Sequence, residues 1–196
     1  MISENSIVLK DSVTSQMTDE EFFRFCTENG DLRIERDHNL NIYIMPPVGT
    51  FGGYQSGEVF GQLLIWNKKT KKGKVFDSST GFTLPDHSVL SPDASWVSTK
   101  KWKGLSPDQR DKFAALCPDF VIEVRSKNDS LEELKNKMAR WISNGVELAW
   151  LIDPLKKTNY IFSSHHPPKT MKGFDKPLVA GEPVEGFVLT LSELLN

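Results

Sequence analysis

The chain has 196 residues, of which 38% are hydrophobic and 26% are charged, and its formal net charge is −2. This length predicts one domain, or one domain with an elaborated terminus. The charge argues against a protein that coats nucleic acid by overall attraction. No apolar run approaches the roughly 20 residues of a membrane span, and the N-terminus lacks a secretory signal pattern, so we expect no membrane partner. Two isolated cysteines, Cys26 and Cys117, fit a reducing cytoplasm.

The first half of the chain predicts a helix, a hairpin, a second helix and a β meander. The first helix begins at a capping box formed by Thr18 and Glu21. Alternating apolar residues on both sides of a polar turn predict the hairpin. The expected bounds are 18–29 for the first helix, 32–36 and 41–45 for the hairpin, about 55–66 for the second helix, and 74–79, 81–84 and 93–97 for the meander.

The second half predicts a strand–helix–strand unit built around two buried strands. Its helix is amphipathic and begins after Ser130, which forms a second capping box with Glu133. The expected bounds are 106–115 for a preceding helix, 119–124, 147–153 and 159–163 for strands, 130–144 for the amphipathic helix, 163–184 for an irregular loop, and 186–196 for a short strand and helical turn. This order favours an α/β (α+β) class, with helices packed on a mixed sheet.

Two carboxylates lie at strand ends, where open α/β sheets usually place their chemistry. Asp93 starts one strand, and Glu123 follows the apolar run 120–122. A glutamate beside such a run costs several kcal/mol unless it is paired or binds a metal. Two convergent carboxylates suit Mg²⁺, which prefers oxygen ligands. The alternative is purely structural, with Asp93 capping a turn and Glu123 paired to Arg125 or Lys137.

Basic residues leave two interpretations open. Lys137 stands at the margin of an apolar stripe, four residues after Glu133, and either forms a surface ion pair or reaches over the sheet end toward a phosphoryl group. The run 68–74, KKTKKGK, is either a solvated turn or a patch that contacts phosphates. No histidine has a partner at metal-ligand spacing, which argues against a zinc site. The common hydrolase, NTPase and dinucleotide motifs do not occur.

Eight short motifs follow one another along the chain. They are Arg33-Ile34-Glu35, Met45-Pro46-Pro47, 76–82 (FDSSTGF), Ser91-Pro92-Asp93, Glu123-Val124-Arg125-Ser126, Lys137 with Trp141, Gly145-Val146, and 150–154 (WLIDP). Together they resemble the Uma-type family of restriction endonucleases, within the PD-(D/E)XK nuclease superfamily, over residues 20 to 190. The resemblance implies a restriction-endonuclease-like mixed sheet flanked by helices. It also implies an N-terminal extension over 1–17 and a single nuclease-like domain over 18–196.

The resemblance also assigns roles to individual residues. Asp93 and Glu123 correspond to the metal-binding carboxylates, and Val124 would offer its backbone carbonyl. Glu35 resembles the additional acidic residue that many such nucleases bring from an N-terminal element. The implied cofactor is Mg²⁺, with Mn²⁺ as a substitute.

The chain departs from the superfamily pattern at one position. Arg125 stands where a lysine is expected, two residues after the glutamate, and Lys137 looks like a migrated replacement. Arginine can bind a phosphate but is a poor proton acceptor. If Lys137 reaches the metal site, the resemblance implies a Mg²⁺-dependent DNA endonuclease. If it does not, the alternative is a degenerate nuclease fold that acts as a nucleic-acid-binding or assembly module.

The expected partner is therefore DNA. Two basic runs are candidate DNA tracks, namely 68–74 and 100–103. A homodimer fits this interpretation, because double-strand cutting needs two sites. The same interpretation predicts a cytoplasmic protein.

Overall fold

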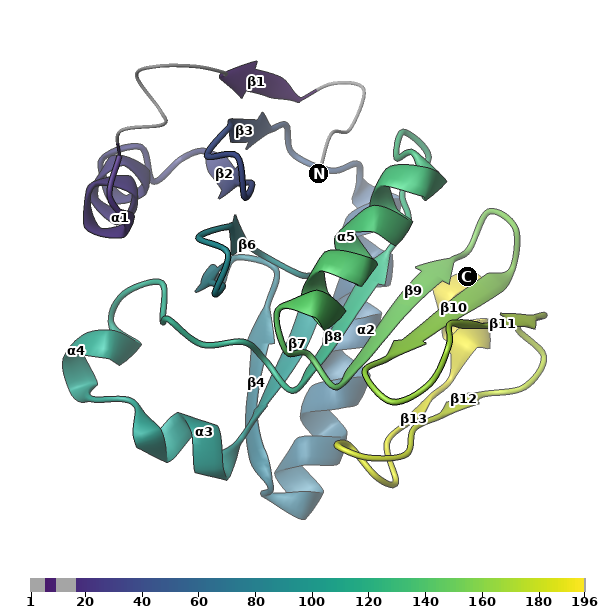
Figure 1. Ribbon diagram of the computed structural model, residues 1–196. Coiled ribbons are helices and arrows are strands. Elements are labelled where there is room, and N and C mark those ends of the chain that lie inside the picture. The colour runs from purple at the N-terminus through teal and green to yellow at the C-terminus, as the bar shows by residue number, and fades with distance from the viewer. Residues whose placement is uncertain (1–5, 10–16, 196) are drawn as a thin grey trace.

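A six-stranded sheet forms the centre of the molecule in the computed structural model, which describes residues 6–9 and 17–195 (Figure 1). The strand order is β11-β10-β9-β8-β7-β4. Only β8 and β9 run parallel, and the other neighbouring strands in this sheet are antiparallel. The bounds are β4 Gly73–Asp77, β7 Ala94–Ser98, β8 Phe120–Val124, β9 Leu148–Asp153, β10 Thr158–Ser163 and β11 Lys169–Lys172.

Two helices cover the two faces of this sheet. Helix α5, Leu131–Ser143, crosses one face, and helix α2, Thr50–Thr70, lies behind the other (Figure 1). Because successive strand residues point to opposite faces, Phe120 and Ile122 pack on the side of α2, while Val121 packs on the side of α5. The next residue on the α5 side of the same strand is Glu123.

A second, five-stranded sheet lies beside α5 and carries the N-terminal part of the chain (Figure 1). Its order is β1-β3-β2-β6-β5. The bounds are β1 Ile7–Leu9, β2 Arg33–Arg36, β3 Ile42–Met45, β5 Phe82–Thr83 and β6 Val89–Leu90. Helix α1, Asp19–Glu28, buries Phe22 against this sheet together with Ile34, Ile42 and Val89. The predicted first helix, its capping box and the predicted hairpin are confirmed.

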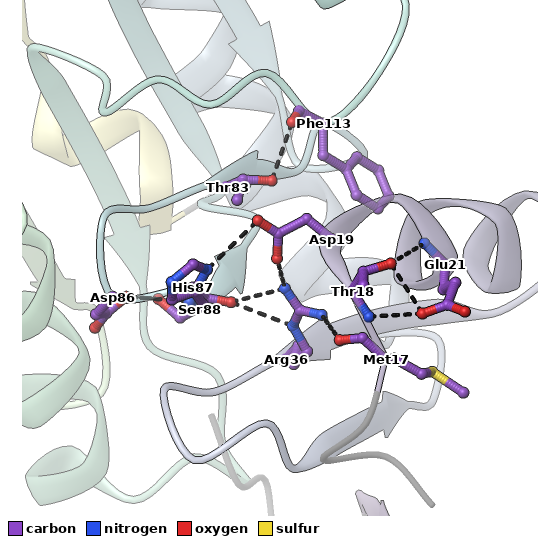
Figure 2. Close-up of polar contacts among 10 residues, drawn as sticks. All are labelled: Met17, Thr18, Asp19, Glu21, Arg36, Thr83, Asp86, His87, Ser88 and Phe113. Atoms are coloured by element: carbon purple, nitrogen blue, oxygen red, sulfur yellow. Dashed lines mark hydrogen bonds and ion pairs between the residues drawn. The ribbon is translucent and has the colours of Figure 1, made fainter.

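The buried side chain of Arg36 ties α1 to the small sheet (Figure 2). Its guanidinium donates to the backbone carbonyls of His87 and Met17 and forms an ion pair with Asp19. The same group lies 4.6 Å from the ring centroid of Phe22. These contacts join α1, β2 and the turn before β6, and they fix the strand that carries the neighbouring Glu35.

The predicted β meander is wrong in its connectivity. Strands β4 and β7 pair with each other in the large sheet, whereas β5 pairs with β6, and β6 pairs with β2 in the small sheet. Alternation along the sequence marks each strand, but pairing depends on contacts that are distant in sequence. Because β6 pairs with β2, the loop between β6 and β7 lies close to β2. There Glu35 accepts a hydrogen bond from the backbone of Ser91.

Three other boundaries differ from the sequence expectation. Helix α2 is longer than predicted, because it continues through a glycine-containing first half. The helix expected at 106–115 is only α4, Pro107–Arg110, and it follows an unpredicted α3, Thr99–Gly104. The loop expected at 163–184 contains β11 and also β12, Leu178–Val179.

The C-terminal segment completes the layer on the α2 side of the large sheet. Strand β12 pairs with β13, Val188–Leu189, and the chain ends in the 3-10 helix η1, Leu191–Leu195. Most of the extension expected over 1–17 lies outside the described residues, although Ile7–Leu9 pairs with β3. In the described part of the chain, no helix combines the length and apolarity needed to cross a membrane.

Candidate active site

The candidate site lies where β7 and β8 meet at one end of the large sheet. Ala94 pairs with Ile122, so continuing this antiparallel register by one residue places Asp93 opposite Glu123. Asp93 is fixed by two hydrogen bonds. Its Oδ2 accepts from the backbone N of Val124 at 2.7 Å, and its Oδ1 accepts from Oγ of Ser56 at 3.1 Å. Elements far apart in the sequence thus hold one carboxylate at the sheet end.

Lys137 reaches across from α5 to this sheet end. Its Nζ lies 2.7 Å from Oε1 of Glu123 and 3.1 Å from Oε1 of Glu35, and it also donates to the carbonyl of Ser91. Only 5% of Lys137 is exposed, and both glutamates are buried. The surface ion pair considered for Lys137 is therefore excluded, and the structure brings together three charged residues from β2, β8 and α5.

Burial and mutual charge set the protonation of this cluster. Burial raises the pKa of Glu123 to about 7, with Asp93 and Glu35 adding to the rise and Lys137 opposing it. Burial also acts to raise the pKa of Glu35, but the charges of Lys137 and Arg33 and the hydrogen bond from the backbone of Ser91 act together against it, and the pKa is lowered. Burial would lower the pKa of Lys137, yet the two glutamates raise it. Lys137 is thus a cation, and Glu123 titrates near neutral pH.

The donor set is compatible with a hard divalent cation. Asp93, Glu123 and Val124 line one cleft, and Oε2 of buried Glu35 has no hydrogen-bond partner among the described residues. Within residues 6–9 and 17–195, no three His, Cys, Asp or Glu side chains gather closely enough to hold a metal by themselves. Mg²⁺ usually needs only one or two carboxylates, because waters and phosphate oxygens supply the other ligands. The residues present therefore fit Mg²⁺.

A cleft of about 1110 Å³ opens in front of the two strand ends. One wall is formed by the first half of α2 and the loop before it. Three cationic side chains line the cleft, namely Arg33, Arg125 and Lys127. The lining of the cleft thus combines carboxylates with cationic side chains, and the cations suit a phosphate-containing ligand.

Arg125 is held away from Glu123 by another partner. Its Nη1 lies 2.9 Å from Oδ2 of Asp153, which is fully buried, and its Nε donates to the carbonyl of Asp129 at 3.1 Å. The ion pair between Glu123 and Arg125 that was considered as a structural alternative is therefore not formed. Glu123 pairs instead with Lys137, which was the other partner considered.

Sequence reasoning gave no role at the site to three residues that support it. They are Ser56, which binds Asp93, Trp141, whose Nε1 donates to Glu123 at 3.4 Å, and Asp153, which fixes Arg125. Trp141 stands one helical turn after Lys137, and this spacing could have indicated a shared neighbour. Ser56 and Asp153 have no comparable local signal, because each contacts a residue distant in sequence.

The two basic runs lie away from the cleft. The run 68–74 begins twelve residues after Ser56 on α2, which is about 18 Å along the helix axis. The run 100–103 belongs to α3, where Lys101 forms an ion pair with Asp119 at 2.9 Å. Asp119 also accepts a hydrogen bond from the backbone of Ser98, so its role is structural. Contact of either run with DNA stays a prediction.

Comparison with known proteins identifies a family for the chain. A family model, Uma2, described as "Putative restriction endonuclease", matches residues 19–192. A crystal structure from Anabaena variabilis ATCC 29413, described as a "putative nuclease", is similar with a TM-score of 0.73 at 20% identity, covering 91% of this chain and 97% of that chain. This similarity confirms the expected nuclease-like α+β fold.

A local similarity connects the chain with a different curated protein. The C4-dicarboxylate-binding periplasmic protein DctP of Vibrio cholerae is 32% identical over 88 residues, which cover 45% of this chain and 26% of that protein. The aligned segment thus spans about a quarter of that relative. The Uma2 match covers most of the chain and includes every candidate site residue. The chain therefore belongs to the Uma2 family, described as restriction endonucleases.

Proposed function

We propose that this protein is a Mg²⁺-dependent endonuclease that hydrolyses phosphodiester bonds of DNA in the cleft. The observation that carries the proposal is the 2.7 Å contact between Nζ of Lys137 and the carboxylate of Glu123. Arg125 stands at the lysine position of the superfamily pattern, so a working site needs a lysine from elsewhere. Lys137 meets this need, since it is buried beside the carboxylate that faces Asp93.

Each residue of the site then has a distinct part in the reaction. Asp93, Glu123 and the carbonyl of Val124 would hold Mg²⁺, which supplies neutralisation of phosphate charge and lowers the pKa of water. Lys137, as a cation, would offset negative charge that develops on the phosphate. Its three N–H groups contact Glu123, Glu35 and the carbonyl of Ser91, so it would orient the attacking water by releasing one of these partners. Glu35 is a positioning residue, because its ion pair fixes the ammonium of Lys137.

The guanidinium of Arg125 would contact a phosphate of the bound strand. Its ion pair with Asp153 fixes the direction of the side chain, and the residue lines the cleft. A fixed guanidinium loses little conformational entropy when it binds an anion. Arg125 therefore suits a role in holding the substrate in line with the water.

A second candidate is a nuclease fold that binds nucleic acid without cutting it. The observation that favours this candidate is the ion pair between Arg125 and Asp153. Arg125 stands at the usual lysine position, and the ion pair occupies part of its guanidinium. The two candidates differ in one outcome. Both bind DNA, but only the first yields cleaved strands in the presence of a divalent cation.

The test is cleavage of supercoiled plasmid by purified protein with Mg²⁺, with Mn²⁺ and with a chelator. We expect nicking with either metal and none with the chelator. The variant Asp93→Asn should lower the nicking rate on the order of a hundredfold or more, because it removes a charge that holds the metal. The matched control is Asp111→Asn, at an exposed aspartate that caps α4 outside the cleft. Absence of nicking with both metals would favour the second candidate.

A further inference from the structure

An exposed apolar surface borders the cleft next to the carboxylates. Four of the residues that line the cleft are large, apolar and exposed, namely Val48, Phe51, Leu155 and Leu195. Exposed apolar side chains that gather at one place usually mark a contact with a ligand or partner. Hydrolysis of a phosphodiester needs charge and water, so the proposed chemistry does not account for this surface.

Phe51 is the aromatic member of this surface, and its neighbours hold it in place. Its ring stacks on Tyr54 with centroids 6.2 Å apart and an interplanar angle of 19°. The hydroxyl of Tyr54 donates to the carbonyl of Glu193 at 2.9 Å, which ties the pair to η1. Phe51 nevertheless stays 52% exposed. An exposed aromatic ring is thus presented at the cleft beside Tyr54.

The position of Phe51 relates it to the proposed reaction centre. It precedes Ser56, the hydroxyl that binds Asp93, by five residues, which is about 7.5 Å along the axis of α2. The same cleft carries the cations Arg33, Arg125 and Lys127. A ligand that satisfies both features has anionic groups beside a flat, apolar face, which is the chemistry of a nucleotide with its base accessible.

Bases in an intact duplex do not present their faces, because each is covered by its neighbours in the stack. An aromatic side chain can stack only on a base that is unpaired or has left the duplex. We propose that Phe51 is a stacking platform for an unpaired nucleobase, so that the strand engaged in the cleft is single-stranded or locally unpaired DNA. The inference rests on the proposed function for the identity of the ligand as DNA.

The test uses oligonucleotides that contain the fluorescent base 2-aminopurine, with a chelator present so that no cutting occurs. Three probes are compared: a single strand, an intact duplex, and a duplex with one unpaired 2-aminopurine. We expect wild-type protein to quench the single strand and the unpaired base, but not the paired base. Phe51→Ala should lose the quenching and weaken single-strand binding about tenfold, since one base loses its aromatic stacking partner. Phe51→Trp should keep both the quenching and the single-strand binding of wild type.

The matched control is Ile65→Ala, because Ile65 is also exposed on α2 but does not line the cleft. This variant should quench and bind as wild type does. Equal quenching by Phe51→Ala and wild type would overturn the inference, as would tight binding of intact duplex with no quenching of either unpaired probe. Quenching of the single strand alone would assign the site to single-stranded DNA, and quenching of both unpaired probes would include bases flipped from a duplex.

The inference and the proposed function fail in different ways. Binding and quenching are measured without metal, so they do not depend on turnover. If wild type quenches the unpaired base but never cuts DNA with Mg²⁺ or Mn²⁺, the stacking platform stands and the endonuclease proposal falls. If wild type cuts DNA while Phe51→Ala binds and quenches normally, the endonuclease stands and the platform falls.

Discussion

Glu123 is a buried glutamate whose protonation depends on its charged neighbours. It is 1% exposed and contacts Lys137, while Asp93 and Glu35 add negative charge nearby. Burial raises the pKa of Glu123 to about 7, and the negative charges of Asp93 and Glu35 add to this rise against the opposing charge of Lys137. A divalent cation would offset these negative charges and displace the proton from Glu123. Metal affinity is therefore expected to rise with pH through neutrality.

The free energy of unfolding of the metal-free protein should depend on pH because of the proton on Glu123. The pKa of Glu123 rises from an ordinary 4.5 to about 7 on folding, so the folded state binds the proton more tightly than the unfolded state. The stabilisation from this group is complete below about pH 4.5 and is lost as the pH rises through about 7, a loss of about 3 kcal/mol. In Glu123→Gln, which does not titrate, this loss should disappear. Urea unfolding in a chelator at several pH values measures the difference between the two proteins.

Two neighbouring groups should not obscure the result. The pKa of Glu35 is lowered and that of Lys137 is raised, so neither titrates between pH 4.5 and 7. Parallel pH profiles for wild type and Glu123→Gln in that interval would show that Glu123 keeps its ordinary pKa in the folded protein. The charge balance described for the site would then be wrong.

At the level of elements, the small sheet is a support for the active site. Strand β2 presents Glu35 to Lys137 on α5, and the adjacent Arg36 points instead into the contact with α1 (Figure 2). Successive residues of one strand thus serve the site on one face and the docking of α1 on the other. Loss of the Arg36 contacts should loosen the strand that holds Glu35.

Arg36→Met tests this support. The substitution keeps an apolar stem but leaves the carbonyls of Met17 and His87 and the carboxylate of Asp19 without their donor. We expect the free energy of unfolding to fall by roughly 2–4 kcal/mol, since removing one partner from a buried charged network is costly. Arg24→Met is the control, because Arg24 lies exposed on α1 and should change stability by less than about 0.5 kcal/mol. Equal stability of the two variants would contradict the supporting role of Arg36.

The elements that could be predicted are those with a local signal. Capping residues and apolar periodicity located α1, α5, β8 and β9 to within one or two residues. The pairing of β6 with β2 and of β5 with β6 could not be predicted, since a two-residue strand has almost no pattern of its own. The start of α2, residues 50–54, was missed because Gly52 and Gly53 weaken the helical signal, although the folded helix includes them.

The same distinction applies to the candidate site. Asp93 and Glu123 stood out because each is a charged residue at the end of a strand, and their motifs resemble a known family. The ion pair of Lys137 with Glu35 joins residues separated by 102 positions, and the pair of Arg125 with Asp153 spans 28. Periodicity in the sequence carries no record of such contacts. Glu35 as a partner of Lys137, and Asp153 as the partner of Arg125, therefore became clear only from the fold.

At the scale of the whole molecule, the site exists only when both sheets and both large helices are assembled. Asp93 and Glu123 come from the large sheet, Glu35 from the small sheet, Lys137 from α5 and Ser56 from α2. The cleft then faces outward at the end of the large sheet, open to a long ligand. Cutting both strands of DNA needs two such clefts, so we expect cleavage of both strands to require a dimer.

The central claim is that Lys137 supplies the lysine of the nuclease site. The most direct test is the initial rate of plasmid nicking in Mg²⁺ by wild type, Lys137→Met and Lys135→Met. Lys135 lies on the same helix, but its ammonium stands 4.2 Å over the ring of Tyr160, so it is a matched control. Because Lys137→Met leaves two buried carboxylates without a cation, the double variant Glu35→Gln/Lys137→Met restores the charge balance if the single variant folds poorly.

We expect Lys137→Met, alone or with Glu35→Gln, to lower the nicking rate on the order of a hundredfold, as removal of a group that stabilises transition-state charge does. Lys135→Met should keep the wild-type rate. A folded Lys137→Met protein that nicks plasmid as fast as wild type would contradict the claim.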